Sequence, residues 1–251
     1  MKTSPSLPRN VILIASEVPL IDEGCSTLGD RPVAHANLLA RHQPFAAWAM
    51  TVATGESPLR HGIFSDSVVD FETLRPRETR AADRHFPAIW DTAATTGLTC
   101  TTIDWPATGG DDALENPTCM AEITKDIKTI DSTICAAIAS TEIPAEQQAS
   151  ERLRGSLTQN LLRVQAISEA VDRVLRTDQP PAFIAWTYRC ARINKKSSPA
   201  VRQSIEAAFA QSLTLLKPET LVFVVQQDGH KSRLSIIGAP TQPPSIEPLP
   251  L

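Results

Sequence analysis

The chain has 251 residues, of which 42% are hydrophobic and 21% charged, with a formal net charge of −4 at pH 7. This length allows one sizeable core, so we expect a single domain over residues 1–251, with irregular tails at 1–10 and 241–251. Proteins that bind nucleic acid or anionic membranes usually carry an excess of basic residues. This mildly acidic chain has no such excess, so neither is expected as a partner.

The N-terminal residues 1–10 are polar and interrupted by prolines, and the apolar run at 11–14 is too short for a signal peptide or a membrane span. We therefore expect a cytoplasmic protein. Five scattered cysteines form no Cys-x-x-Cys pair, which favours reduced, buried thiols over a zinc or redox site: Cys25, Cys100, Cys119, Cys135 and Cys190.

Continuous apolar runs predict buried strands at residues 11–14, 98–103, 182–188, 221–225 and 234–237. Helices are predicted at 46–53, where Gly55 would form a left-handed cap, and, from apolar residues three or four apart, at 149–177 and 199–216. Strands that alternate with helices predict an α/β fold with a mostly parallel central sheet and helices on both faces. Residues 106–135 carry no clear signal, 142–147 is expected to be a surface loop, and the proline-rich end from Gly238 should be irregular.

Three sequence blocks occur in a fixed order: Thr54-Gly55 with Pro58-Leu-Arg-His61-Gly62, then Phe86-Pro-Ala-Ile-Trp90-Asp, then Ile103-Asp-Trp105-Pro-Ala-Thr108. Together they resemble framework motifs of the alkaline phosphatase-like superfamily, most closely its type I phosphodiesterase and nucleotide pyrophosphatase branch. The resemblance implies a reduced alkaline phosphatase-like fold. It also implies the ancestral chemistry, cleavage of phosphate or sulfate esters with two divalent metal ions.

The reactive residues of that family are not matched in the first half of the chain. The resemblance places the nucleophile ten residues before Gly55, at Phe45, whose ring cannot attack phosphorus. Thr51 is the nearest hydroxyl downstream, more than one helical turn too late, and is interpreted as a packing or surface residue. Glu17 stands after the first strand, where relatives carry a metal-binding Asp.

The later motifs are altered in the same way. Arg192 and Lys196 fall where relatives have an Asp and a His that bind metal, and the neighbouring registers offer no carboxylate or imidazole either. Gln227 and Asp228 replace the Asp and His of a Ser-Asp-His-Gly motif. His230 precedes the last strand and is the best surviving ligand candidate, whereas His61 is assigned to the turn motif.

These replacements favour a degenerate, non-catalytic family member, a pseudoenzyme with a binding or regulatory role and no cofactor. Arg192 and Lys196 would then attract a small anionic ligand into the vestigial cleft, or would be solvated loop residues. An alternative is a divergent metal-dependent phosphodiesterase or phosphatase that uses Glu17, Asp228 and His230 on one metal. A third hypothesis is an unrelated doubly wound protein with a ligand crevice at its strand ends. The protein partner is left open by the sequence.

Overall fold

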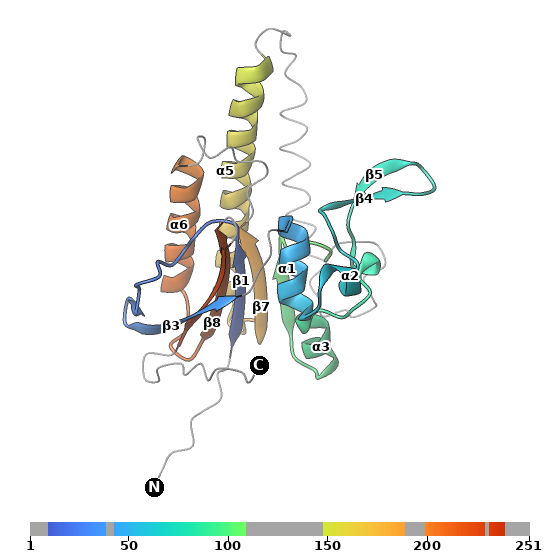
Figure 1. The fold of residues 1–251 in the computed structure, drawn as a ribbon. Helices are drawn as coiled ribbons and strands as arrows, with labels where there is room; N and C mark the ends of the chain where they lie inside the picture. Colours follow the sequence, from blue (N-terminus) through green and yellow to red (C-terminus); the bar gives the residue numbers. More distant parts are fainter. Residues whose placement is uncertain (1–9, 39–42, 109–147, 189–198, 229–230, 239–251) are drawn as a thin grey trace.

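The computed structural model describes residues 10–38, 43–108, 148–188, 199–228 and 231–238. Its elements form a seven-stranded sheet with helices on both faces, which confirms the predicted α/β class (Figure 1). In chain order they are β1 (Val11–Ser16), β2 (Thr27–Leu28), β3 (Arg31–Leu38), α1 (Phe45–Thr54), α2 (Pro58–His61), β4 (Ser67–Asp70), β5 (Arg75–Glu78), the 3-10 turn η1 (Ala81–Asp83), α3 (Ile89–Thr95), β6 (Cys100–Ile103), α5 (Gln148–Leu175), β7 (Phe183–Tyr188), α6 (Pro199–Thr214), β8 (Leu221–Asp228) and β9 (Lys231–Ile237).

The sheet has the order β2-β3-β9-β8-β1-β7-β6, and its four strands from β8 to β6 run parallel. At its centre, Val11 of β1 lies opposite Phe183 of β7 and Leu221 of β8. The side chains of Ile12 and Ile14 are fully buried. The continuous apolar run at the start of β1 is thus explained by a strand that is covered on both faces.

The other edge of the sheet is antiparallel. β9 pairs antiparallel with both β8 and β3, and β3 pairs antiparallel with β2. The apolar run at 234–237 groups with the parallel strands by sequence, but its strand is antiparallel because only residues 229–230 separate β8 from β9. A parallel connection needs a crossover of a dozen or more residues, so this link permits only an antiparallel pair.

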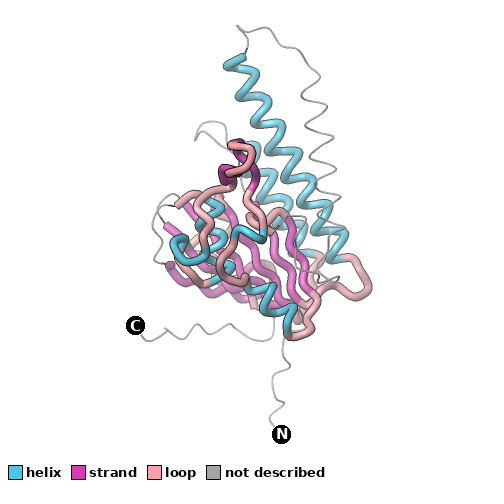
Figure 2. The backbone as a smooth tube through the Cα atoms, turned by 90° about the vertical axis from the view of Figure 1, so that its right-hand side faces the viewer, coloured by secondary structure: helices cyan, strands magenta, loops and turns pink. Residues whose placement is uncertain are grey.

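One face of the sheet is covered by the two long helices α5 and α6, which lie side by side (Figure 2). Both were predicted from their apolar spacing, within two residues at every end. Their apolar stripes and the sheet share one buried cluster, which includes Val164, Ile167 and Val171 of α5, Ile205 and Phe209 of α6, and Ile12 and Ile14 of β1. Burial of each such aliphatic side chain contributes about 1.5–3 kcal/mol, so this layer supplies much of the core.

The opposite face is covered by α1 and α3. Helix α1 is rich in alanine, and Ala46 and Ala49 are fully buried, which lets the helix approach the sheet closely. It ends at Gly55, which has a φ of 71° and donates its backbone N–H to the carbonyl of Thr51 at 2.9 Å. The predicted left-handed glycine cap is therefore confirmed.

The β4–β5 hairpin projects from the body on the side of α2 and α3 (Figure 1). Neither this hairpin nor β2 and β3 is predicted by the sequence pattern. No helix in the described residues is long and apolar enough to span a bilayer. Several predictions fall outside the described residues. They concern residues 109–135, which carry no clear signal, the surface loop at 142–147, and the two irregular tails apart from Asn10.

Candidate functional site

The carboxyl ends of the parallel strands meet at one edge of the sheet, where open α/β folds place their ligand sites. The strand register brings Ser16 of β1 between Tyr188 of β7 and Gln226 of β8. All three side chains are nearly or fully buried. The residues that follow these positions are therefore the candidates for chemistry.

The end of β1 is fixed by a local turn. The hydroxyl of Ser16 donates to the carbonyl of Val18 at 2.8 Å and accepts the N–H of Val18 at 3.2 Å. The backbone N–H of Glu17 donates to the carbonyl of Tyr188 at 3.1 Å, which joins the end of β1 to the end of β7. Glu17 is half-buried, and the structure places it at the strand edge where its sequence position predicted it.

Phe45, which the resemblance aligns with the nucleophile of relatives, is the first residue of α1. Its side chain is only 6% exposed, and its ring centroid lies 5.5 Å from that of Trp48. It belongs to a buried cluster with Leu13 of β1 and Val225 of β8. The ring is thus part of the core between α1 and the sheet, and burial of such a side chain contributes about 3 kcal/mol.

The end of β8 carries two glutamines whose amides bind the backbone. Gln226 accepts the N–H groups of Leu20 and Ile21 at 2.9 and 3.2 Å and donates to the carbonyl of Ile21 at 2.8 Å. Gln227 donates to the carbonyl of Gln43 at 3.5 Å, which ties the strand end to the segment before α1. The two amides hold the loops around this edge in place.

Three of the candidate residues lie at the same edge of the sheet: Glu17, Phe45 and Gln227. The pairing of β1 with β8 brings Glu17 near Gln227, and the hydrogen bond between Gln227 and Gln43 ties the start of α1 to the same edge. Asp228 is the last residue of β8, and its side chain lies outside the described part of the structure. Arg192, Lys196 and His230 also lie outside it. Neither the cationic cleft nor the three-ligand metal site is therefore tested.

Asp104 is a strand-end carboxylate that is not among the site residues predicted from sequence. It follows β6 with a φ of 56°, and Arg163 of α5 contacts both of its carboxylate oxygens, with Nε at 3.0 Å from Oδ2. The hydroxyl of Thr187 on β7 donates to the carbonyl of Asp104 at 2.7 Å. An acidic residue directly after a buried strand was the available signal, but its partner lies 59 residues away in the sequence.

The His61 side chain of the turn motif is fully buried and has a structural role. Its Nδ1 accepts the N–H of Ile63 at 3.1 Å, so this nitrogen carries no proton and Nε2 donates to the hydroxyl of Thr51 at 3.2 Å. Thr51 in turn donates to the carbonyl of Ala47 at 3.0 Å. Burial lowers the pKa of His61, which keeps the ring neutral. The turn is thereby locked to α1.

The other two blocks of the resemblance also contact each other. At the start of α3, Asp91 accepts the N–H of Ala88 at 2.7 Å and a hydrogen bond from the Arg84 guanidinium at 2.6 Å. The rings of Trp90 and Trp105 meet edge to face at 5.3 Å. Trp90 and Trp105 belong to the same buried cluster as Phe45 and the other buried residues of α1, so the three blocks pack together.

Among the described residues, no group of three His, Cys, Asp or Glu side chains is arranged to hold a metal ion. At the strand edge, the described donors are Glu17, two amides that bind the backbone, and Asp104, which pairs with an arginine. A two-metal centre requires several carboxylates and imidazoles that converge. The described part of the edge does not fit such a centre.

The comparisons with solved structures give distant matches. Phosphonoacetate hydrolase from Sinorhizobium meliloti 1021, in complex with phosphonoformate, is 15% identical with a TM-score of 0.48, over 87% of this chain and 56% of that protein. Human ectonucleotide pyrophosphatase / phosphodiesterase 5 is 13% identical with a TM-score of 0.41, over 77% of this chain and 47% of that protein. The chain thus spans about half the length of these proteins.

No curated protein matches the sequence significantly. The model of the family described as type I phosphodiesterase / nucleotide pyrophosphatase matches residues 45–191, a range that runs from α1 through β7 and includes all three framework blocks. The match covers more than half of the 251 residues. On this ground the chain belongs to the type I phosphodiesterase / nucleotide pyrophosphatase family.

Proposed function

We propose that this protein is a non-catalytic member of its family, which keeps the α/β scaffold and serves in binding or regulation. The observation that carries the proposal is the packing of Phe45, which fills the nucleophile position with a buried ring. A hydroxyl or thiol is needed there for attack on phosphorus, and the neighbouring positions 44 and 46–49 supply neither.

The charges around this edge support the same proposal. Gln226 and Gln227 are neutral amides engaged with the backbone, and neutral amides hold divalent cations more weakly than carboxylates do. The sequence adds Arg192 and Lys196 shortly after β7. Two cations there oppose metal binding and favour a small anionic ligand such as phosphate or sulfate.

A hydrolysis assay on the purified chain tests the absence of catalysis. We expect no turnover of p-nitrophenyl phosphate or bis-p-nitrophenyl phosphate above the buffer blank with magnesium, manganese or zinc present, and no bound metal by elemental analysis. Metal-dependent turnover that is lost in Glu17→Ala or His230→Ala, but kept in Glu169→Ala at an exposed position of α5, would instead establish the divergent phosphodiesterase.

Isothermal titration with phosphate and with sulfate tests the ligand. We expect saturable binding that disappears in the double variant Arg192→Ala/Lys196→Ala and persists in Lys217→Ala, which removes a charge between α6 and β8. Equal binding by the two variants would assign Arg192 and Lys196 to solvated loop positions and would remove the anionic ligand from the proposal.

A further inference from the structure

A row of polar side chains crosses the sheet near the carboxyl ends of its parallel strands. The strand register places one residue from each of five neighbouring strands in line: Tyr188, Ser16, Gln226, Arg233 and Asn37. Residues that pair directly across strands share a face, and Tyr188 packs in the cluster beneath α5 and α6, so the row lies on that face. Buried polar groups need hydrogen-bond partners. For three members of the row the partner is residues 18–25, the segment after β1, which we call the strap.

Side chains of β8 and β9 bind the middle of the strap. Gln226 accepts the N–H groups of Leu20 and Ile21 and donates to the carbonyl of Ile21. Arg233 donates to the same carbonyl from Nη1 at 3.2 Å, and its Nη2 pairs with the carboxylate of Glu23. The strap therefore runs across the strands and is held by one side chain after another.

A histidine of β3 binds the far part of the strap. The Nε2 atom of His35 lies 2.6 Å from the carbonyl oxygen of Cys25, which can only accept, so this nitrogen is the donor. The Nδ1 atom then accepts the hydroxyl of Ser235 at 2.9 Å. This contact extends the polar hold on the strap to a third strand.

The two ends of the strap are held differently from its middle. Glu17, just before the strap, donates its N–H to the carbonyl of Tyr188 at 3.1 Å, and Ser26, just after it, accepts the N–H of Val33 at 2.8 Å. Between these two residues, in the part of the chain that the structure describes, the strap makes backbone–backbone hydrogen bonds only within its own length. The ends are thus fixed by backbone bonds and the middle by side chains.

Apolar contacts hold the strap mainly at one point. Ile21 is 2% exposed and belongs to the cluster beneath α5 and α6. Val18 and Leu20 are half-buried against the same cluster, and residues 22–24 are exposed. The remaining contacts of the strap are polar, and water can replace them when they separate.

We propose that the strap opens and closes as one unit about its fixed ends at Glu17 and Ser26. Opening exposes the side chains of Gln226 and Arg233 at the strand edge, and the sheet itself stays paired. Local opening of this kind is expected where few apolar contacts are buried and the backbone is held by side chains. The proposal is independent of any ligand in the strand-edge cleft.

Hydrogen exchange of the full chain, followed by NMR at the amides of Leu20 and Ile21, tests the proposal. We expect both amides to be protected and yet to exchange about a hundredfold faster than those of Ile12 and Ile14 in β1. Low concentrations of urea should barely change this exchange, because the opening exposes little surface. Exchange at the rate and with the urea dependence of β1 would overturn the proposal, and so would a complete lack of protection.

The variant Arg233→Met tests whether the strap moves as a unit. It removes the contacts to Glu23 and to the carbonyl of Ile21 but leaves Gln226, the acceptor of both measured N–H groups. A strap that opens as one unit should then exchange about tenfold faster at Leu20 and Ile21, the effect of losing a charge-assisted hydrogen bond. Unchanged exchange at these two amides would refute the proposal.

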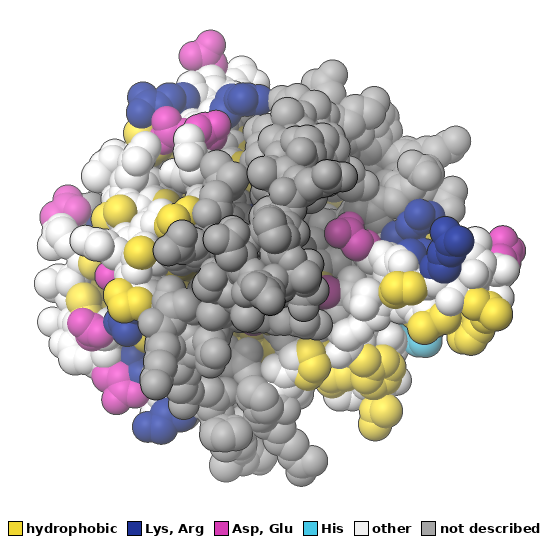
Figure 3. Space-filling model, turned by 90° about the horizontal axis from the view of Figure 1, so that it is seen from above, with side chains coloured by type: hydrophobic (Ala, Val, Ile, Leu, Met, Phe, Trp, Pro, Cys, Tyr) yellow, Lys and Arg dark blue, Asp and Glu magenta, His cyan; other side chains and the backbone are white. Residues whose placement is uncertain are grey.

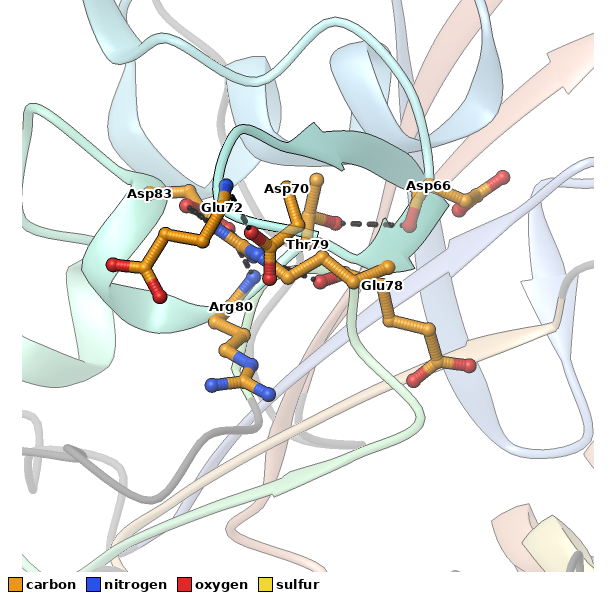
Figure 4. A network of polar contacts seen from close by, with 8 residues as sticks. Asp66, Asp70, Glu72, Glu78, Thr79, Arg80 and Asp83 are labelled. Atoms are coloured by element: carbon orange, nitrogen blue, oxygen red, sulfur yellow. Dashed lines mark hydrogen bonds and ion pairs between the residues drawn. The ribbon is translucent and has the colours of Figure 1, made fainter. Parts of the chain in front are cut away.

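The chain offers matched controls for this variant. Acidic and basic side chains also lie next to one another elsewhere on the surface (Figure 3). Arg176→Met removes such an ion pair, with Asp172 on α5, and should leave strap exchange unchanged. In the β4–β5 hairpin, the N–H groups of Glu72 and Thr73 are likewise bonded to a side chain, the carboxylate of Asp70, at 2.8 and 3.2 Å (Figure 4). An equal rise at these two amides in Arg233→Met would assign the effect to general destabilisation and would count against the strap.

A milder variant guards against a folding defect. The side chain of Glu23 is 67% exposed, so Glu23→Gln should fold normally and raise exchange at Leu20 and Ile21 about threefold. Salt screens exposed ion pairs, so sodium chloride should speed strap exchange in the wild type and have less effect in Glu23→Gln. An equal response of the two proteins to salt, with no rise in Glu23→Gln, would refute the role of this ion pair in holding the strap.

Discussion

Replacement of His61 by alanine tests whether the turn motif is a structural lock. The change leaves the N–H of Ile63 without its acceptor in a site where both residues are almost fully buried. An orphaned buried donor costs about 1–3 kcal/mol, and the lost contact to Thr51 with the void left by the ring adds about 2 kcal/mol. We expect a total loss of about 3–5 kcal/mol, a large part of the stability of an ordinary domain.

Urea unfolding followed by tryptophan fluorescence measures this loss, since all four tryptophans are buried. His61→Asn is the graded control, because its Oδ1 can take the acceptor role of Nδ1 without reaching Thr51. It should lose roughly half as much stability as the alanine variant. A change below about 0.5 kcal/mol for His61→Ala would refute the structural interpretation, since that is the range of ordinary surface substitutions.

The same variant has a defined pH dependence. Burial lowers the pKa of His61 in the folded state below the value of about 6.5 for an unfolded histidine. Below that pH the unfolded chain takes up a proton that the folded chain does not, so the wild type loses stability by up to about 1.4 kcal/mol per pH unit. The alanine variant lacks this titration. The stability difference between the two proteins should therefore be largest above pH 7, by this linkage, and should narrow as the pH falls.

Three other sites give direct predictions for thermal or urea unfolding. Arg31→Met removes three hydrogen bonds, of 2.8 to 3.3 Å, to backbone carbonyls after α6, and should lower the free energy of unfolding by about 2–4 kcal/mol. Arg31→Lys should keep part of that stability. Gly62→Ala should cost about 1–2 kcal/mol more than Gly97→Ala: both glycines have a φ of 84°, but only at Gly62 would a Cβ meet neighbouring atoms, at 3.1 Å. Arg163→Met should cost about 2–3 kcal/mol because it strands the buried carboxylate of Asp104, and the double variant with Asp104→Asn should regain most of that loss.

The sequence predicted the elements whose own residues carry the signal. β1 and β7 are continuous apolar runs, and α5 and α6 repeat apolar residues at helical spacing. The missed strands β3 and β5 contain proline, arginine and histidine, because they pair at an edge or project from the body. Their pairing is set by partners elsewhere in the chain, which no local pattern records.

The candidate site could be predicted only where single residues carry the signal. Motif spacing named Glu17, Phe45 and Gln227 as candidates, and the structure places Glu17 directly after β1, Phe45 at the start of α1 and Gln227 near the end of β8. It did not predict that Gln226 binds the backbone of residues 20–21, or that Asp104 is neutralised by Arg163. Both contacts join segments that are far apart in sequence. Hydrogen-bond partners of this kind are therefore seen only in the folded structure.

The framework blocks that carry the family resemblance make contacts that stabilise the fold. His61 locks a turn to α1, Asp91 begins α3, and Trp105 packs on Trp90, and each contact serves stability whether or not a nucleophile is present. Phe45 adds its ring to the same cluster, where a polar nucleophile would have to face a cleft. Packing alone is therefore sufficient to retain these blocks. A match to them establishes the fold, and function has to be argued from the residues at the strand ends.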